Sequence, residues 1–310
     1  MWNNFQVGII GSGGQYQRIS KILKRKKIGY YLYKPNNKNY FNKNDYEKLK
    51  TCNIIFILSS NNSHFNYIKN LYRNRYIFCE KPPVNKKEEL KKLYQINYKK
   101  IYFNFNFRFS KIAEMLSLRK KFKLGNLLYG NIILGHGLAL KKVYGKNWRS
   151  NIKYNKKGVF ELVSVHWLDL INYFYKLKKV QNVRLENFFK IGNSYDNSYC
   201  TIVLKNKAEI DVFSSYTSPL IKKINFVFKN GTITQDENII EIRGPANNFD
   251  KNNFFVKPKL IKKYILSEKR DYQLSLEKSV NFFLERAKKK LSFKKKDFDC
   301  SITSNEMILK

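Results

Sequence analysis

Residues 7–16 read Val-Gly-Ile-Ile-Gly-Ser-Gly-Gly-Gln-Tyr, a short apolar run followed at once by a glycine-rich turn. Residues 16–26 then carry apolar side chains at Ile19, Ile22 and Leu23, the spacing of one helix face. A dinucleotide-binding fold needs this order, because the turn presents bare backbone amides to a pyrophosphate at a helix N-terminus. A plain β–α turn has the same composition. The candidate cofactor-binding residues of this turn are Gly11, Ser12, Gly13, Gly14 and Gln15.

Strand-like and helical patterns alternate through the rest of the first hundred residues. Residues 53–58 form a near-continuous apolar run, typical of a strand that is buried on both faces of a parallel sheet. Further strands are expected at 76–79 and 100–105, with helices from Ser63 and over 86–95. This alternation predicts parallel βαβ units, so residues 1–105 are expected to form a Rossmann NAD(P)-binding domain in an α/β fold.

The second half of the chain has a different pattern. A helix is expected over 161–175, and strands over 182–189, 199–204, 209–215 and 223–228. Asn230-Gly231 is a strong hairpin signal. A last helix is expected over 275–289. Residues 106–310 are therefore expected to form an α+β domain with an open, mainly antiparallel sheet.

Composition limits the function. The 310 residues include 61 Lys and Arg against 23 Asp and Glu, a formal net charge of +38 that invites a nucleic-acid hypothesis. The lysines are spread along the whole chain and accompany many Asn, Ile, Tyr and Phe residues, which indicates a bias toward A/T-rich codons. Without a nucleic-acid-binding motif, no specific nucleic-acid partner is expected.

Membrane, disulfide and metal signals are weak. The purest apolar run, Ile54–Leu58, is far shorter than the roughly 20 residues of a spanning helix. Four cysteines and three histidines stand scattered, without metal-ligand or disulfide spacing. The chain begins with a strand-like pattern rather than a signal peptide. We therefore expect no membrane partner, no metal and a cytoplasmic location.

The residue that would hold the cofactor ribose departs from the usual pattern. An acidic residue is expected about 20 residues after the glycine turn, but Lys34 stands at the end of the second expected strand, which covers residues 29–33. A lysine cannot accept a hydrogen bond from a ribose hydroxyl, although it can neutralise a 2′-phosphate. Lys34 therefore either favours NADP over NAD or is one more lysine of a lysine-rich chain.

Two further segments follow expected strands, where open α/β sheets bind ligands. Ser59, Ser60, Asn61 and His64 follow the third strand, and Glu80, Lys81 and Pro82 follow the fourth. A lysine at the second position can hydrogen-bond a substrate hydroxyl and the nicotinamide ribose. A polar loop with a helix cap and a surface loop with a chance lysine are the plain alternatives.

These segments together resemble the Gfo/Idh/MocA oxidoreductases, the relatives of glucose–fructose oxidoreductase and inositol dehydrogenase. The resemblance extends to Asn106-Phe107-Arg108-Phe109, Leu124-Gly125-Asn126-Leu127, Asn147-Trp148-Arg149 and residues 158–169, which end His166-Trp167-Leu168-Asp169. It covers most of the chain in the family's order.

The resemblance implies an NAD- or NADP-dependent oxidoreductase that acts on a CH–OH group of a sugar, cyclitol or nucleotide-sugar, with a guessed role in surface polysaccharide synthesis. The nicotinamide would face the open sheet of the second domain. Lys81 would contact cofactor and substrate, and His166 would be the general acid/base, for which an imidazole with an ordinary pKa of about 6.5 is suited. Asp169 would orient the imidazole or a substrate hydroxyl. Homo-oligomerisation through the exposed sheet face is also implied. Substrate-binding candidates are Asn106, Arg108, Trp148 and Arg149.

One departure supports an alternative function. Many family members carry an aspartate four residues before the histidine, where this chain has Leu162. Glu161 is adjacent, but on an α-helix it points about 100° away. The alternative is thus a catalytically impaired relative that binds dinucleotide or sugar without turnover.

Overall fold

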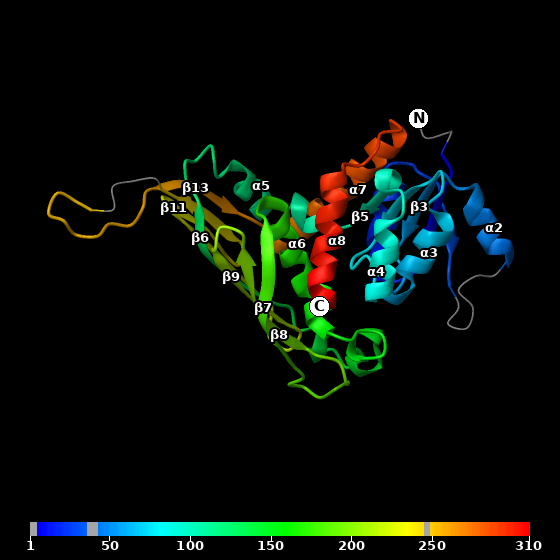
Figure 1. The fold of residues 1–310 in the computed structure, drawn as a ribbon, viewed down its shortest axis with the longest axis horizontal. Coiled ribbons are helices and arrows are strands. Elements are labelled where there is room, and N and C mark those ends of the chain that lie inside the picture. The colour runs from blue at the N-terminus through cyan, green and yellow to red at the C-terminus, as the bar shows by residue number, and fades with distance from the viewer. Residues whose placement is uncertain (1–4, 36–42, 245–248) are drawn as a thin grey trace. The chain divides into compact units, whose positions relative to one another are not determined.

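The computed structural model describes residues 5–35, 43–244 and 249–310 (Figure 1). The chain divides into two compact units. The first comprises residues 1–106 and 276–310, and the second comprises residues 107–275. Within the described residues, no helix is both long enough and apolar enough to cross a membrane.

The first unit is built on a five-stranded parallel sheet in the order β2-β1-β3-β4-β5. The strand residues are almost all buried, which explains their continuous apolar runs. This is the expected Rossmann-like α/β architecture. The strands are β1 (Val7–Ile10), β2 (Tyr31–Tyr33), β3 (Ile54–Ile57), β4 (Tyr76–Cys79) and β5 (Ile101–Phe103).

Helices connect these strands, and two further helices close the unit. The connecting helices are α1 (Gly14–Arg25), α2 (Lys43–Thr51), α3 (His64–Leu71) and α4 (Lys87–Tyr94). At the end of the chain come α7 (Glu268–Lys288) and α8 (Lys295–Leu309). The sequence analysis did not identify α2 or α8.

The C-terminal segment belongs to the first unit, whereas the sequence analysis placed it in the second domain. Phe283 on α7 packs against Phe56 and Phe78, with ring centroids 5.3 Å apart in both pairs. Phe298 on α8 packs against Phe103 of β5 at 5.8 Å. A parallel sheet must be covered on both apolar faces, and the strand–helix pattern of the first hundred residues does not reveal that the cover comes from the far end of the chain.

The second unit contains an eight-stranded sheet in the order β13-β12-β11-β10-β6-β9-β8-β7. Only the β6–β9 pair is parallel, so the expected mainly antiparallel sheet is confirmed. Helices α5 (Lys111–Leu118) and α6 (Val165–Phe174) lie along one face of this sheet (Figure 1). The strands are β6 (Leu127–Gly135), β7 (Leu177–Glu186), β8 (Asn197–Leu204), β9 (Glu209–Ser215), β10 (Ile221–Phe228), β11 (Gly231–Asp236), β12 (Ile239–Arg243) and β13 (Leu260–Ile265).

Several boundaries differ from the sequence analysis. Strand β7 begins at Leu177 rather than at residue 182, and β6, β12 and β13 were not identified. In β6, Gly130 interrupts the pattern, because a Cβ there would lie 3.0 Å from both Ile210 and Phe226. A glycine inside a strand marks such a close approach and weakens the sequence signal for the strand.

The turn after β1 provides a test of the fold. Gly11 has φ +102°, and a Cβ there would lie 2.8 Å from the backbone of Leu58 and Ser59. Gly11→Ala is therefore expected to lower the free energy of unfolding by at least about 2 kcal/mol, because neither the dihedral nor the neighbouring backbone can adjust. Urea denaturation of both the variant and the wild type measures this.

Gly29→Ala is the matched control, because a Cβ at Gly29 meets no atom within 4 Å. This control is expected to stay within about 1 kcal/mol of the wild type. Equal stability of the two variants would contradict the close approach at Gly11.

Candidate functional site

The glycine turn and the serine-rich loop lie at the point where the strand order of the first sheet reverses. Strands β1 and β3 are neighbours, with Ile10 opposite Ile57, while β2 lies on the other side of β1. The connections from β1 and β3 therefore leave in opposite directions. Open α/β sheets bind ligands in the crevice at this switch point, outside the carboxyl ends of the strands.

The glycine turn leaves its backbone accessible. A Cβ on Gly13 would meet no atom within 4 Å, and one on Gly14 would meet only the Arg18 guanidinium at 3.9 Å. Helix α1 starts at Gly14, and no side chain caps it and no acidic residue stands in its first turn. Its first amides therefore carry no side-chain cap. The Gly11 N–H donates to the Tyr33 carbonyl at 2.9 Å, and the cofactor-binding role of Gly11, Ser12, Gly13 and Gly14 stays a prediction.

Tyr16 stands where the dinucleotide-binding fingerprint usually has a third glycine. Its partly exposed ring packs edge-on against Tyr30, with ring centroids 6.2 Å apart. Tyr16 precedes the buried Ile19 and Leu23 by three and seven residues, so it lies on the same side of α1 as they do.

The loop after β3 is held by its own hydrogen bonds. The hydroxyls of Ser59 and Ser63 lie 2.7 Å apart, and Ser63 also donates to the Ser60 carbonyl at 2.7 Å. Ser60 donates to the Asn62 side-chain oxygen at 2.7 Å. Asn61 is buried beside them. The loop at the switch point, which contains Ser59, Ser60 and Asn61, is therefore held in one conformation by internal hydrogen bonds.

His64 is buried between two loops, and its assignment to cofactor binding stays a prediction. Its side chain is buried, with 1% relative exposure. Nδ1 lies 2.8 Å from the Pro82 carbonyl and Nε2 lies 3.2 Å from the Ser59 carbonyl. Burial lowers the pKa of His64 to about 4, against the opposing effect of the two carbonyls. A neutral imidazole carries one N–H, so it can donate to only one of these two carbonyls, and the Pro82 carbonyl is the nearer.

This histidine should make stability depend on pH. As the pH falls below the ordinary histidine pKa of about 6.5, the unfolded chain binds a proton that the folded His64 does not accept until about pH 4. The wild type should lose about 3 kcal/mol of unfolding free energy between pH 7 and pH 4 from this group. Urea denaturation across that range measures the loss.

The control is His64→Asn, which keeps a donor near the Pro82 carbonyl and removes the titration. His136 and His166 are present in both proteins and cancel in the comparison. Parallel stability curves for the two proteins would show that His64 does not titrate in this way.

Glu80 is also internal, whereas the sequence analysis assigned it to the cofactor. Its side chain is buried, with 6% relative exposure. Its Oε1 accepts hydrogen bonds from Gln15 Nε2 at 2.9 Å and from Asn104 Nδ2 at 2.7 Å. Burial raises the pKa of Glu80, and these two donors and the Lys81 charge oppose the shift. Glu80 and Gln15 therefore connect the glycine turn to the tip of β4.

Lys81 and Lys34 lie beyond the carboxyl ends of their strands. Lys81 follows Glu80 at the tip of β4, is half-buried and precedes a cis peptide bond to Pro82. Lys34 follows β2 and is exposed. Both positions match the sequence analysis, and both roles stay predictions.

In the second unit, Arg108 and Asp169 bind each other. Arg108 Nε donates to Asp169 Oδ2 at 2.7 Å, and Nη2 donates to Oδ1 at 2.5 Å. The two side chains are 6% and 1% exposed. The Arg108 guanidinium also lies 4.9 Å from the centre of the Tyr173 ring. The Nε–Nη2 edge of Arg108 is thus occupied by Asp169, and the substrate-binding role of Arg108 stays a prediction.

His166 is held by an aromatic neighbour that the sequence analysis did not identify. Its ring stacks on Phe107 with centroids 4.4 Å apart and planes 19° apart. Phe107 also meets Trp167 edge-on at 4.9 Å. Arg108, the next residue after Phe107, holds Asp169, one turn after His166. Phe107 therefore covers one face of the imidazole, and Arg108 holds Asp169 on the same helix.

A π-helical turn over Phe160–Ser164 precedes His166, and the sequence carried no signal for it. The Val165 N–H donates to the Phe160 carbonyl, five residues earlier. Such turns are rare in proteins, and those that occur are often found at functional sites. Glu161 and Leu162 are adjacent, so their side chains point in different directions in a π-helical turn as well. Glu161 is buried and accepts from the Lys157 N–H at 3.3 Å.

Leu162 belongs to an apolar cluster with Val159, Val163, Tyr144 and Tyr216. It therefore supplies no proton-transfer group at the position where the family carries an aspartate. Burial raises the pKa of Tyr144 to about 12, and the nearby Arg149 charge opposes this shift.

Arg149 and Trp148 remain together as candidate substrate contacts. The Arg149 guanidinium stacks 4.3 Å from the centre of the Trp148 ring, and Trp148 packs against the apolar cluster of Leu162. Asn106 is buried in a short 3-10 turn at the end of the first unit's N-terminal segment. The substrate-binding role of Asn106 stays a prediction.

The buried pair of Arg108 and Asp169 provides a test. Asp169→Asn leaves the Arg108 charge buried without its counter-ion and is expected to cost about 3–5 kcal/mol of unfolding free energy. The double variant Arg108→Met/Asp169→Leu removes both charges and should recover most of this loss. Chemical denaturation of the three proteins measures it, and a cost below about 1 kcal/mol for Asp169→Asn would refute the buried ion pair.

No family model and no curated protein matches this sequence. Solved structures match it by fold. A dehydrogenase, MviM, from Clostridium difficile shares 17% identity over 98% of this chain and 97% of that chain, with a TM-score of 0.71. A myo-inositol dehydrogenase from Corynebacterium glutamicum shares 15% identity over 98% and 94% of the two chains, with a TM-score of 0.71.

A levoglucosan dehydrogenase, solved in complex with NADH and levoglucosan, shares 13% identity over 98% and 95% of the two chains, with a TM-score of 0.76. These identities establish the fold alone. A Rossmann-type unit followed by an open, mainly antiparallel sheet is thus the fold of these dehydrogenases, as the resemblance to the Gfo/Idh/MocA oxidoreductases predicts.

Proposed function

We propose that this protein binds NAD or NADP on its first unit and transfers hydride to or from a hydroxyl-bearing carbon of a sugar-like molecule. The observation that carries the proposal is the glycine turn at the β1/β3 switch point. There the backbone of Gly13 and Gly14 is bare and the first turn of α1 is uncapped and free of acidic residues. This arrangement suits a pyrophosphate.

The residues fit a dinucleotide in two further respects. The loop at Ser59, Ser60 and Asn61 lies on the other side of the switch point, within reach of the same crevice, and Lys81 stands at the tip of the next strand. A bound nicotinamide would supply the hydride acceptor or donor. The solved structures of similar fold support this, since several are described with NAD+ or NADH.

His166 is proposed as the general acid/base. It would take the proton of a substrate hydroxyl when the carbon is oxidised and return it in the opposite direction. The stack on Phe107 makes this imidazole a positioned group rather than a mobile one. Asp169 would orient the imidazole or a substrate hydroxyl, as the resemblance implies. The substrate, the polysaccharide role and self-association stay predictions of the resemblance, and a cytoplasmic location stays a prediction of the sequence composition.

Cofactor binding tests the first part of the proposal. NADH or NADPH fluorescence should report binding by the wild type, and Gly13→Ala should weaken it roughly tenfold, the loss of about one amide contact. Gly29→Ala should bind normally. If NADPH binds more tightly than NADH, Lys34→Ala should remove that preference. Absence of binding to both cofactors would overturn the proposal.

Turnover over a panel of sugars and cyclitols tests the second part. His166→Ala should lower kcat by about 10²–10⁴ while cofactor affinity stays unchanged. Cofactor binding without turnover of any panel member, identical in wild type and His166→Ala, would instead support the catalytically impaired relative.

A further inference from the structure

A cavity lies in the sheet unit, at the far end of helix α6, which carries His166. It has a volume of about 450 Å³, within the range of small-molecule sites. Its lining joins the segment between α5 and β6 to Tyr175, which follows the last residue of α6. Nine residues separate His166 from Tyr175, about 14 Å along a helix axis. The cavity is therefore distinct from the surroundings of His166.

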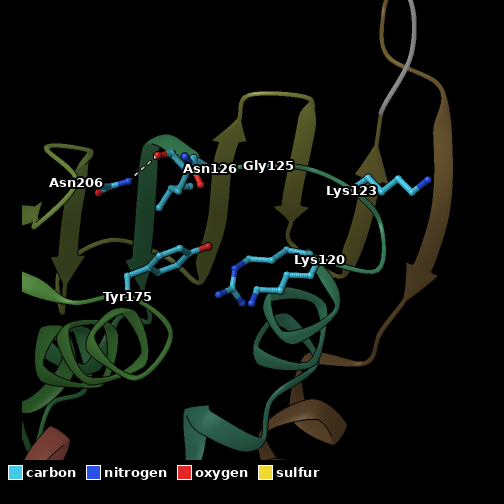
Figure 2. Close-up of a pocket in the computed structure, with 8 residues that line it drawn as sticks. Lys120, Lys123, Gly125, Asn126, Tyr175 and Asn206 are labelled. Carbon is cyan, nitrogen blue, oxygen red and sulfur yellow. Dashed lines mark hydrogen bonds between the residues drawn. The ribbon is translucent and has the colours of Figure 1, made fainter.

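The lining is strongly basic. Arg119, Lys120 and Lys123 contribute three cationic side chains, Asn126 and Asn206 contribute amides, and none of the lining residues is acidic. Figure 2 shows Lys120 extending toward Tyr175, with Lys123 at the outer rim. The cavity thus has the charge to attract an anion.

The walls are held in place before any ligand binds. The Arg119 guanidinium lies 5.1 Å from the centre of the Tyr175 ring and 5.9 Å from that of Phe174, and its Nη1 donates to the Leu116 carbonyl at 2.8 Å. The loop between α5 and β6 is hydrogen-bonded to the β10–β11 hairpin, because the Asn230 N–H donates to the Leu124 carbonyl at 2.9 Å. A ligand would therefore not have to order this loop.

The Tyr175 hydroxyl is the second, independent observation. It is shielded from solvent, and among the described residues no atom forms a hydrogen bond with it. Figure 2 shows it pointing into the space between Asn126 and Lys120. Burial raises the pKa of Tyr175 to about 12, against the Arg119 charge, so the hydroxyl keeps its proton and can donate. A buried hydroxyl without a partner is costly, and an oxyanion would satisfy it.

We propose that this cavity binds the phosphate group of a small phosphorylated molecule. The cations at 119 and 120 would pair with the phosphate charge, and the Tyr175 hydroxyl would donate to one of its oxygens. A phosphate has more acceptor oxygens than a carboxylate, so it can accept from both cationic side chains and from the Tyr175 hydroxyl together. The cavity volume leaves room for the organic part of the molecule.

Isothermal titration calorimetry at a constant ionic strength of about 0.15 M tests this, with inorganic phosphate and glycerol 3-phosphate as probes and chloride as the balancing anion. Tyr175→Phe keeps the ring and all charges and is expected to weaken binding of both probes about tenfold, because a hydrogen bond to a charged acceptor is lost. Its unfolding free energy in chloride should not fall. That result separates a binding role from a structural one.

Neighbouring lysines provide the charge control. Lys120→Gln should weaken phosphate binding about tenfold, whereas Lys121→Gln removes the same charge outside the lining and should change it less than twofold. Binding lost equally in both variants would mean attraction to a basic surface only. Unchanged binding in Tyr175→Phe, or no binding by the wild type, would overturn the proposal. His166→Ala should leave phosphate binding unchanged, so this test is independent of the oxidoreductase proposal.

Discussion

The first unit depends on one buried carboxylate. Glu80 accepts hydrogen bonds from Gln15 at the start of α1 and from Asn104 after β5. Asn104 in turn accepts from the Ser279 hydroxyl at 2.7 Å, and Ser279 lies 2.7 Å from the Tyr102 hydroxyl. A carboxylate can be buried only when donors replace its water, so these positions are coupled. The chain of contacts connects the glycine turn, the tip of β4 that carries Lys81, and helix α7.

The second unit positions its candidate residue differently. The glycine turn works through bare backbone, whereas the His166 imidazole is held by side chains. Phe107 covers one face of the ring, and Arg108 holds Asp169 one turn later. Ser164 binds the sheet through the hydroxyls of Ser198 at 3.1 Å and Ser214 at 2.9 Å. A polar contact between helix and sheet limits how α6 can rotate, and so keeps the imidazole in one place.

Much of the first unit could be predicted from the sequence, because its signals are local. Continuous apolar runs identified the strands, and the glycines between the first strand and the first helix indicated the switch point. The C-terminal helices could not be placed in this way, since Phe283 and Phe298 meet their partners only after the chain has folded back. In the second unit, the glycine within β6 interrupts the apolar pattern of that strand. Strands β12 and β13 are short, so each carries only a weak pattern.

By itself, the sequence determined the fold class, the candidate nucleotide-binding turn and the chemistry available at Lys81 and His166. It determined these because residue type and spacing along the chain are sufficient for them. Only the tertiary structure decided which polar groups are satisfied internally. His64 and Glu80 are buried between loops, and Arg108 is paired with Asp169. A side chain's hydrogen-bond partners and solvent exposure depend on residues distant in the sequence, and these decide whether it can meet a ligand.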